Sequence, residues 1–225
     1  MKTQTNHLIE MRAKHVAFNR LDLIVVVGMT AILFVIAMLV LALGSTGANA
    51  RRIACTNNLK STGIAFRLFA TDNGDKNPDS YFTNKTAWPF SLPGTNFVAP
   101  HFLAMSNELN NPRILLCPSD RRIPATAWAN LSDANISYFV GLDTDATRPS
   151  ELLAGDRNLT VDGKPVRGGI VKLSRTNQLG FSSEMHNRVG NAALADGSVQ
   201  NLTFSRLNAQ LRSASNSIQH LAIPR

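Results

Sequence analysis

The chain has 225 residues, which is enough for one domain of ordinary size with an anchor or tail but not for two full domains. Lys and Arg outnumber Asp and Glu by 23 to 15, yet the resulting net charge of +8 is dispersed and forms no basic stripe interleaved with aromatic residues. This distribution argues against a nucleic-acid partner. The two cysteines form no Cys-x-x-Cys pair, which argues against a structural metal held by thiolates.

An uncharged apolar run lies near the N-terminus, over residues 23–43. As a helix, this run would be about 30 Å long, which is the thickness of the hydrocarbon core of a bilayer. We therefore predict a membrane-spanning helix within residues 18–47. The alternative is a conventional cleavable signal, for which the small residues of Ala48-Asn49-Ala50 would supply the cleavage site.

Basic residues predominate before this run, at Lys2, Arg12, Lys14 and Arg20. The positive-inside rule then keeps the N-terminus in the cytoplasm. We predict a cytoplasmic leader at residues 1–17 and a single-pass protein of the inner membrane, with membrane lipid as a partner. The remainder of the chain would lie in the periplasm or outside the cell.

Residues 48–71 continue the helical pattern with one apolar face. Small or apolar residues recur every three or four positions, at Cys55, Leu59, Thr62, Phe66 and Phe69. Turn residues follow at 72–75, so the helix should end there. We predict one long helix whose second half is amphipathic, followed by a head at residues 72–225.

For the head, the sequence predicts short strands and few helices. We expect a loop over 78–100, followed by a short helix over 102–109. The predicted strands are 136–142, 169–173, 179–183, 192–195 and 199–204. Ser205 would cap a short helix to about residue 214, and 220–223 would form an edge strand before Pro224. A helix followed by strands describes an α+β domain with a small antiparallel β-sheet head.

The segment around residue 18 reads Val-Ala-Phe-Asn-Arg-Leu-Asp-Leu-Ile-Val. It resembles the processing segment of type IV pilins and type II secretion pseudopilins, in which a prepilin peptidase cuts before a Phe that can then be methylated. The resemblance places the cut between Ala17 and Phe18. It also makes Asp22 the carboxylate that pairs with a neighbouring subunit's new amine and sets the assembly register. Ala17 replaces the family's usual Gly, Arg20 an apolar residue and Asp22 the usual Glu. From position alone, Asp22 would simply be solvated among the lipid headgroups.

Four further motifs occur in order, at residues 51–60, 117–120, 155–158 and 186–197. Together they are similar to bacterial pilin-like proteins with a C-terminal prepilin-type processing-associated region. That region is defined by a His, nine residues and Asp-Gly, here His186, Asp196 and Gly197. The resemblance implies a pilin-like fold and a structural subunit of a type II secretion or type IV pilus-like assembly. Its partners would be other pilin-like subunits or further copies of itself, together with the prepilin peptidase.

Asp196-Gly197 between apolar stretches predicts a two-residue type I′ hairpin turn. In a regular hairpin His186 would lie about 15 Å from Asp196, too far for a catalytic contact. The sequence also contains no Gly-x-Ser-x-Gly. We therefore predict no enzyme: His186 has a structural role ahead of ligand or metal contact, and catalysis is the least favoured.

The two cysteines allow one bridge. In an oxidising space, a disulfide between Cys55 and Cys117 would tie the long helix to the loop before the sheet. Such a bridge would be worth about 4 kcal/mol in the chain-entropy model. The alternative is two buried free thiols.

Asp143, Asp145 and Asp156 are candidates for calcium ligands, because some pseudopilins hold this ion in a C-terminal loop. Their spacing matches no EF-hand, and solvated turn residues are the alternative. No other metal or cofactor is predicted. The functional prediction is a pilin-like structural subunit. The rival is a membrane-tethered extracytoplasmic binding module for a glycan, calcium or protein, which does not polymerise.

Overall fold

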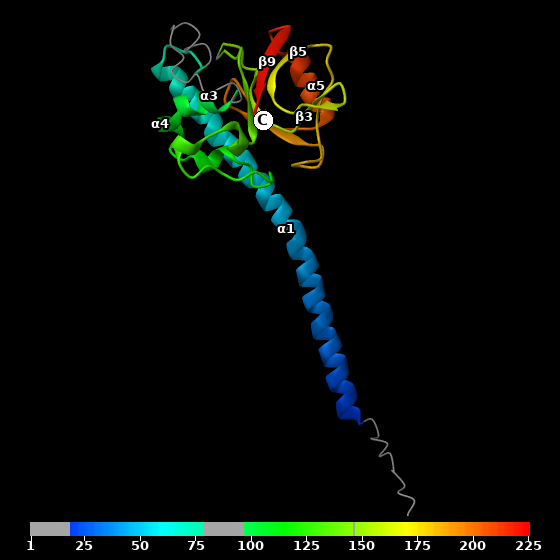
Figure 1. Cartoon of the computed structure of the whole chain (residues 1–225). Helices are drawn as coiled ribbons and strands as arrows, with labels where there is room; N and C mark the ends of the chain where they lie inside the picture. Colours follow the sequence, from blue (N-terminus) through cyan, green and yellow to red (C-terminus); the bar gives the residue numbers. More distant parts are fainter. Residues whose placement is uncertain (1–18, 79–96, 146) are drawn as a thin grey trace, which may run out of the picture. The chain divides into compact units, whose positions relative to one another are not determined.

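The computed structural model describes residues 19–78, 97–145 and 147–225 (Figure 1). The chain divides into two compact units, with the boundary between Gly47 and Ala48. Helix α1 (Arg20–Asp72) contributes residues to both units. The predicted leader at 1–17 and the predicted cleavage site at Ala17 and Phe18 lie outside the described residues.

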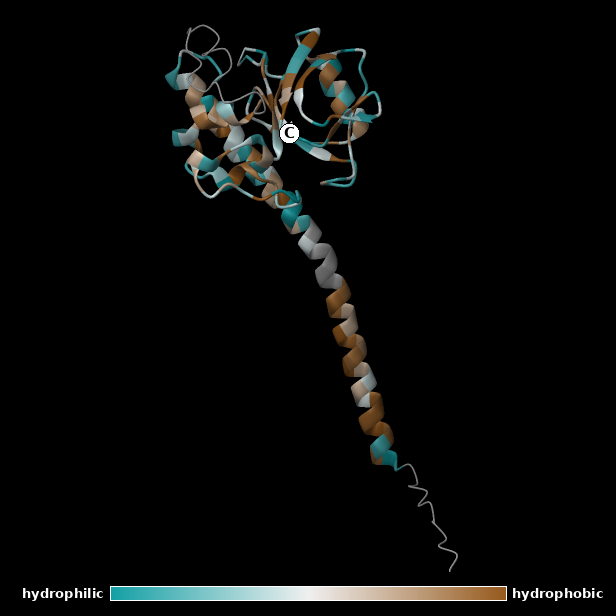
Figure 2. Cartoon of the chain, in the orientation of Figure 1, coloured by the Kyte–Doolittle hydropathy of each residue, from teal (hydrophilic) through white to brown (hydrophobic). Residues whose placement is uncertain are grey.

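The first unit contains the apolar part of α1. Among the described residues, one helix is long and apolar enough to cross a membrane, and the stretch concerned is Arg20–Leu41 with a mean hydropathy of 3.1. Its large apolar side chains, from Leu21 to Leu41, are 49–76% exposed, and Figure 2 shows this stretch coloured mainly as hydrophobic. A helix apolar on all sides needs lipid or other helices around it. An N-terminal signal sequence would have the same composition.

The second unit is built around the remainder of α1. The side chains of Cys55, Leu59, Thr62, Phe66 and Phe69 are all buried, so the predicted apolar face is the one that packs inward. The helix ends at Asp72, where Gly74 and Asp75 adopt positive φ angles of 69° and 59°.

Short helices cover the buried face of α1. They are α3 (Ala99–Ala104), α4 (Ser106–Leu109), η1 (Pro112–Leu115), η2 (Trp128–Asn130) and η3 (Asp133–Asn135). The single helix predicted over 102–109 is therefore two helices that begin three residues earlier. The Asp133 carboxylate fixes this start, because it accepts hydrogen bonds from the backbone amides of Phe97, Val98 and Ala99 at 2.7–3.1 Å. Phe66 and Phe102 pack edge to face with ring centroids 6.1 Å apart.

A six-stranded antiparallel sheet follows in the order β5-β9-β1-β2-β7-β8. A smaller antiparallel sheet has the order β4-β3-β6, so the α+β prediction is confirmed. The strands of the larger sheet are β1 (Tyr138–Gly141), β2 (Leu152–Asp156), β5 (Gly169–Ser174), β7 (Gly190–Leu194), β8 (Val199–Leu202) and β9 (Ile218–Ile223). The smaller sheet contains β3 (Leu159–Val161), β4 (Lys164–Pro165) and β6 (Leu179–Phe181).

The larger sheet separates two cores. Tyr138 and Val140 of β1 belong to the cluster that includes the α1 stripe, whereas Phe139 between them belongs to a second cluster. Helix α5 (Phe204–Ser213) contributes Leu207 and Leu211 to that second cluster. Alternate residues of one strand thus face α1 on one side of the sheet and α5 on the other.

Three local predictions were wrong. Strand β9 is not an edge strand, because it pairs with both β5 and β1 and ends at Ile223, before Pro224 can remove a ladder hydrogen bond. Helix α5 is capped by Thr203, one residue before it begins, rather than by Ser205. The hairpin between β7 and β8 has a three-residue loop in which only Gly197 has positive φ (84°), so it is not a type I′ turn.

Asn208 joins α5 to the smaller sheet. Its Oδ1 accepts from the Leu179 amide at 2.9 Å, and its Nδ2 donates to the Leu179 and Phe204 carbonyls at 2.7 Å. Asn208→Ala should lower the free energy of unfolding by about 1–3 kcal/mol, since it leaves buried polar groups unpaired. Urea denaturation measures this change. Ser205→Ala, at an exposed position of the same helix, is the control, and equal stabilities of the two variants would contradict the assigned role.

Candidate functional site

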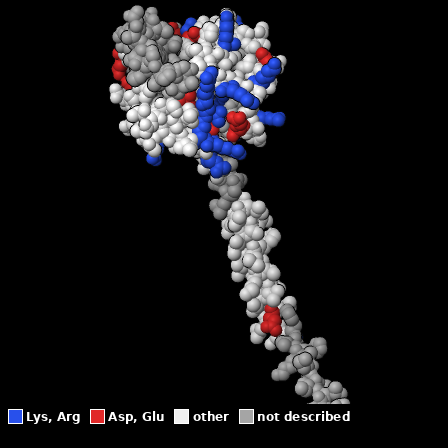
Figure 3. All heavy atoms as spheres, in the orientation of Figure 1, with Lys and Arg blue, Asp and Glu red and all other residues white. Residues whose placement is uncertain are grey.

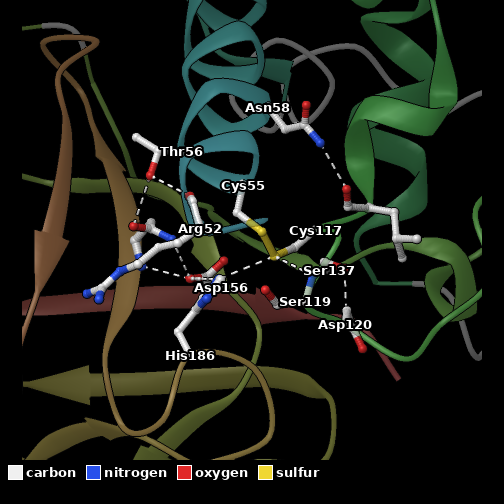
Figure 4. Close-up of a disulfide and its surroundings, with 12 residues drawn as sticks. Arg52, Cys55, Thr56, Asn58, Cys117, Ser119, Asp120, Ser137, Asp156 and His186 are labelled. Atoms are coloured by element: carbon white, nitrogen blue, oxygen red, sulfur yellow. Dashed lines mark hydrogen bonds and ion pairs between the residues drawn. A yellow bond between two sulfur atoms is a disulfide. The ribbon is translucent and has the colours of Figure 1, made fainter. Parts of the chain in front are cut away.

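All four sequence motifs contribute a residue to one buried place, although they are far apart in the chain (Figure 4). The motif at 51–60 supplies Cys55 from α1, and the motif at 117–120 supplies Cys117 from the loop after η1. Asp156 comes from the end of β2, and His186 from the loop between β6 and β7. The structure joins Cys55 to Cys117 in a disulfide with a Cα–Cα distance of 4.8 Å, and both residues are fully buried.

His186 lies against this bridge. Its Nε2 is 3.2 Å from Cys117 Sγ and 3.6 Å from Asp156 Oδ2, and its side chain is only 3% exposed. Burial, aided by the positive charge of Arg52, lowers the pKa of His186 below its ordinary value. The ring is therefore neutral at pH 7. The ring packs in the core, and its Nε2 faces the sulfur of Cys117 and the carboxylate of Asp156.

Asp156 is a completely buried carboxylate. Strand β2 pairs with β7, which places Asp156 beside Asn191: Asp156 Oδ2 accepts from the Asn191 backbone amide at 2.7 Å and from its Nδ2 at 3.0 Å. Asp156 Oδ1 has no hydrogen-bond partner in the described part of the chain. Burial raises the pKa of Asp156 to about 7, against the opposing effect of the two Asn191 hydrogen bonds.

A bidentate ion pair fixes the loop that carries Cys117. Arg157 donates from Nε and Nη2 to the two oxygens of Asp120 at 2.8 and 2.9 Å, and Ser137 Oγ donates to Asp120 Oδ2 at 2.9 Å. The Asp120 side chain is 2% exposed. The second and third motifs therefore hold each other directly, and this contact positions Cys117 near the end of β2.

Close packing explains why position 155, in the third motif, is a glycine. A Cβ atom at Gly155 would lie 2.6 Å from the Phe139 ring and 2.9 Å from the Asn191 carbonyl oxygen. Such a contact is far inside van der Waals distance, so any side chain here would push β2 away from its neighbours. Gly155 thus permits the close strand packing that sets Asp156 beside Asn191.

A pocket of about 500 Å³ opens next to His186. Its lining includes Arg51, Arg52, Arg121, Ser119 and Asp120. Three guanidinium groups against one carboxylate, which is itself paired with Arg157, leave the pocket cationic. Figure 3 shows Lys and Arg side chains gathered over one visible face of the second unit.

Cys55, Cys117, Asp156 and His186 form what we call the disulfide cluster. Asp196 and Gly197 are not part of it. They form the tip of the β7–β8 hairpin, where Asp196 Oδ1 accepts from the Ser198 amide at 2.8 Å. The Asp196 carbonyl accepts from Arg67 Nη1 on α1 at 2.7 Å. The Asp-Gly pair therefore anchors the hairpin to the helix, as expected of an architectural turn. His186, predicted to end a strand of the same hairpin, instead lies in the loop between the two sheets.

The three candidate calcium ligands do not converge. Asp143 and Asp145 line a separate pocket of about 740 Å³, whereas Asp156 belongs to the disulfide cluster. Asp143 Oδ2 is 2.7 Å from His220 Nδ1, and Asp145 Oδ1 accepts from the backbone amide and hydroxyl of Thr147 at 2.8 Å. The three aspartates are therefore not gathered at one site.

Asn191 and Arg52 were missed as members of the site. Asn191 also accepts hydrogen bonds from Thr56 Oγ1 at 3.3 Å and from Asn201 Nδ2 at 3.0 Å, so it links α1, β2 and β8. The available signal was an amide residue at the head of the apolar strand Asn-Ala-Ala-Leu. Arg52 donates from Nη2 to Asn201 Oδ1 at 2.6 Å, which places its charge beside the cluster.

The cluster holds groups suited to proton transfer or metal binding. A neutral imidazole next to a carboxylate is a common acid–base arrangement. The sulfur that contacts the ring is already bonded in the disulfide, so it is not a free nucleophile. Among the described residues, Cys55, Cys117 and His186 offer three ligand atoms within 4.8 Å of one another.

Removing the disulfide should weaken the fold substantially. The bridge joins residues 62 positions apart, so a Cys55→Ser, Cys117→Ser double variant should lose about 4 kcal/mol of unfolding free energy. Chemical denaturation of the full chain in detergent measures the loss. Wild-type protein treated with a phosphine reductant should match the double variant, whereas unchanged stability in both samples would show that the bridge does not constrain the chain.

The Asp120–Arg157 pair should make stability depend on pH. Burial alone would raise the pKa of Asp120, but the hydrogen bonds and charge of Arg157 outweigh it and lower this pKa below 3.8. The stabilisation is therefore complete above the unfolded-state pKa and is lost as the pH falls through the lower folded-state value. Asp120→Asn should cost about 1–3 kcal/mol at pH 7, and the difference from wild type should shrink below pH of about 4.

A matched control exists for this measurement. Glu184 lies 3.4 Å from the same Arg157, but its side chain is 61% exposed. Glu184→Gln should change stability by less than about 1 kcal/mol because exposed ion pairs contribute little. An effect of Asp120→Asn no larger than that of Glu184→Gln at pH 7 would refute the role of the buried pair.

Comparisons of the chain with protein-family models, with curated proteins and with solved structures found no match. The similarity to pilin-like proteins therefore remains a resemblance carried by the motifs.

Proposed function

We propose that the chain is a pilin-like structural subunit of a type II secretion or type IV pilus-like assembly, anchored in the inner membrane by α1. One observation carries this proposal: residues 20–41 form a fully exposed apolar helix with a single acidic residue, Asp22, in its first turn. Lipid alone would explain the apolar surface, with Asp22 solvated among the headgroups. Packing of several such helices would explain the same surface and would also give Asp22 a partner.

Asp22 is the residue on which assembly would depend. Its carboxylate accepts a hydrogen bond from the Asn19 backbone amide at 3.1 Å. In a bundle of apolar helices an unpaired carboxylate is costly, and a neighbouring subunit's N-terminal amine would neutralise it. Cleavage before Phe18 would create that amine four residues before Asp22, so processing and assembly would be linked by one ion pair.

The second unit supports the proposed location. Disulfides form and persist in oxidising compartments, so the Cys55–Cys117 bridge supports a head outside the cytoplasm. The basic leader supports the same topology, with the N-terminus inside. Helix α1 would serve as anchor through residue 41 and as the buried support of the head from Cys55 onward.

A second candidate is a membrane-tethered binding module that does not polymerise. The cationic pocket lined by Arg51, Arg52 and Arg121 favours it, since a purely structural head has no need of an open pocket of about 500 Å³. Such a pocket would suit an anionic ligand. The two candidates differ in the fate of the N-terminus.

Processing separates them. The full chain expressed with a prepilin peptidase should yield a mature protein that starts at Phe18, and without the peptidase it should retain Met1. N-terminal sequencing and intact mass of the membrane-extracted protein measure this directly. A chain that keeps its leader in both strains would support the tethered module and contradict the filament subunit.

Two variants of Asp22 test its role in assembly. Asp22→Ala should be processed normally, yet it should lower the yield of crosslinked multimers by about tenfold or more, because the helix amine would lack its partner. Asp22→Glu keeps the charge and should assemble like the wild type. Equal multimer yields from all three proteins would show that Asp22 does not set the register.

A further inference from the structure

The disulfide cluster contains more ligand atoms than a disulfide needs. The sulfur atoms of Cys55 and Cys117 and the Nε2 of His186 lie within 4.8 Å of one another, and all three residues are buried. Asp156 Oδ2 is 3.6 Å from the same Nε2. Figure 4 shows His186 and Asp156 directed toward the bridge from different segments of the chain.

We propose that the dithiol form of the protein binds one zinc ion at this cluster, through Cys55, Cys117, His186 and Asp156. Two thiolates, an imidazole and a carboxylate are a donor set that selects Zn²⁺ over Mg²⁺ or Ca²⁺. Binding releases the two thiol protons and the proton of any Asp156 carboxyl that is protonated before binding. The four ligands carry three negative charges and zinc two positive ones, so the complex would carry a charge of −1, which the nearby guanidinium of Arg52 opposes.

Two of the distances between ligand atoms match those of a tetrahedral zinc site. Zn–S bonds of about 2.3 Å and Zn–N or Zn–O bonds of about 2.0–2.1 Å place neighbouring sulfur and nitrogen atoms about 3.5 Å apart, and nitrogen and oxygen about 3.3 Å apart. The corresponding distances here are 3.2 Å for Cys117 Sγ to His186 Nε2 and 3.6 Å for His186 Nε2 to Asp156 Oδ2. The two sulfur atoms must separate to about 3.8 Å once their bond is absent, and the Asp156 carboxylate must turn toward them, because it is not among the three ligand groups that already lie within 4.8 Å of one another.

An independent observation favours a cation beside Asp156. Asp156 Oδ1 is buried without a hydrogen-bond partner in the described part of the chain, which is costly for a carboxylate in the core. Ligation through Oδ1 would satisfy this oxygen, because Oδ2 already accepts two hydrogen bonds from Asn191. The pocket of about 500 Å³ is lined by His186, one of the four proposed ligands.

Zinc and the disulfide exclude each other, because both use the same two sulfur atoms. Reduction of the bridge consumes two electrons and two protons from a thiol reductant and yields the two thiols that zinc then deprotonates. A newly made chain also has both thiols before oxidation. The cluster would thus be crosslinked by zinc in the dithiol state and by the disulfide in the oxidised state.

The test uses the full chain in detergent micelles. Reduced anaerobically with a phosphine, it should bind one Zn²⁺ per chain, as measured by competition with a chromophoric chelator, and the oxidised chain should bind none. Co²⁺ in place of Zn²⁺ should give thiolate charge-transfer bands and intense visible bands of a tetrahedral site. His186→Ala should weaken binding by about 100-fold or more and Asp156→Asn by about 10–100-fold.

A second His–Asp pair supplies the control. His220 and Asp143 lie 2.7 Å apart outside the cluster, so His220→Ala and Asp143→Asn should leave zinc affinity unchanged. The proposal fails if reduced wild-type protein binds no zinc or gives a Co²⁺ spectrum without tetrahedral thiolate bands. It also fails if a His186→Ala variant with a native circular dichroism spectrum binds zinc as tightly as wild type. Because the spectrum of the wild type is itself decisive, the test does not depend on the variants folding.

Discussion

Burial of one face of α1 between Cys55 and Phe69 is the constraint on which the second unit depends. Helices α3, α4 and η1 and strand β1 contribute side chains to the cluster around this face. Helix propensity alone would not keep the stretch of α1 between Cys55 and Phe69 stable in water. Packing of its buried face stabilises the helix, and the helix in turn orders the side chains that pack there. The disulfide adds a covalent tie near the start of the packed face. The α5 core lies on the opposite side of the sheet and reaches α1 only through the strands between them.

Elements with a clear period or strong end signals could be predicted from the sequence. The stripe on α1 and its end at Asp72 follow from helical spacing and from the turn residues after it. Strand β2 was missed because Leu152–Asp156 is buried on both faces and so has no alternation to recognise. Strand β9 was assigned to an edge because of Pro224, but the proline lies beyond the last paired residue and constrains nothing within the ladder. The local sequence can indicate that a strand forms, but it does not show which strands pair with it.

For the same reason, the sequence could indicate the residues of the site but not which of them contact each other. All four residues of the cluster lie in the four sequence motifs, and two cysteines allow only one disulfide, Cys55–Cys117. The partner of His186 could not be found, since the linear motif draws attention to Asp196, ten positions away. The carboxylate that meets the ring is Asp156, brought there by the pairing of β2 with β7. Thiolate metal binding also looked improbable from spacing, because the third ligand is remote in the chain and near only in the fold.

Asp156 is the residue that stability alone does not explain. A buried carboxylate with one unpaired oxygen costs free energy that an apolar side chain of similar size would avoid. Its two Asn191 hydrogen bonds compensate one oxygen only. A cation shared with His186 and the two sulfurs would compensate the other oxygen, Oδ1, and it would link α1 to the loop at Cys117 across the same 62 positions as the disulfide. On this argument the two crosslinks replace each other at one place in the fold, so the packed face of α1 stays tied to the sheet in both redox states.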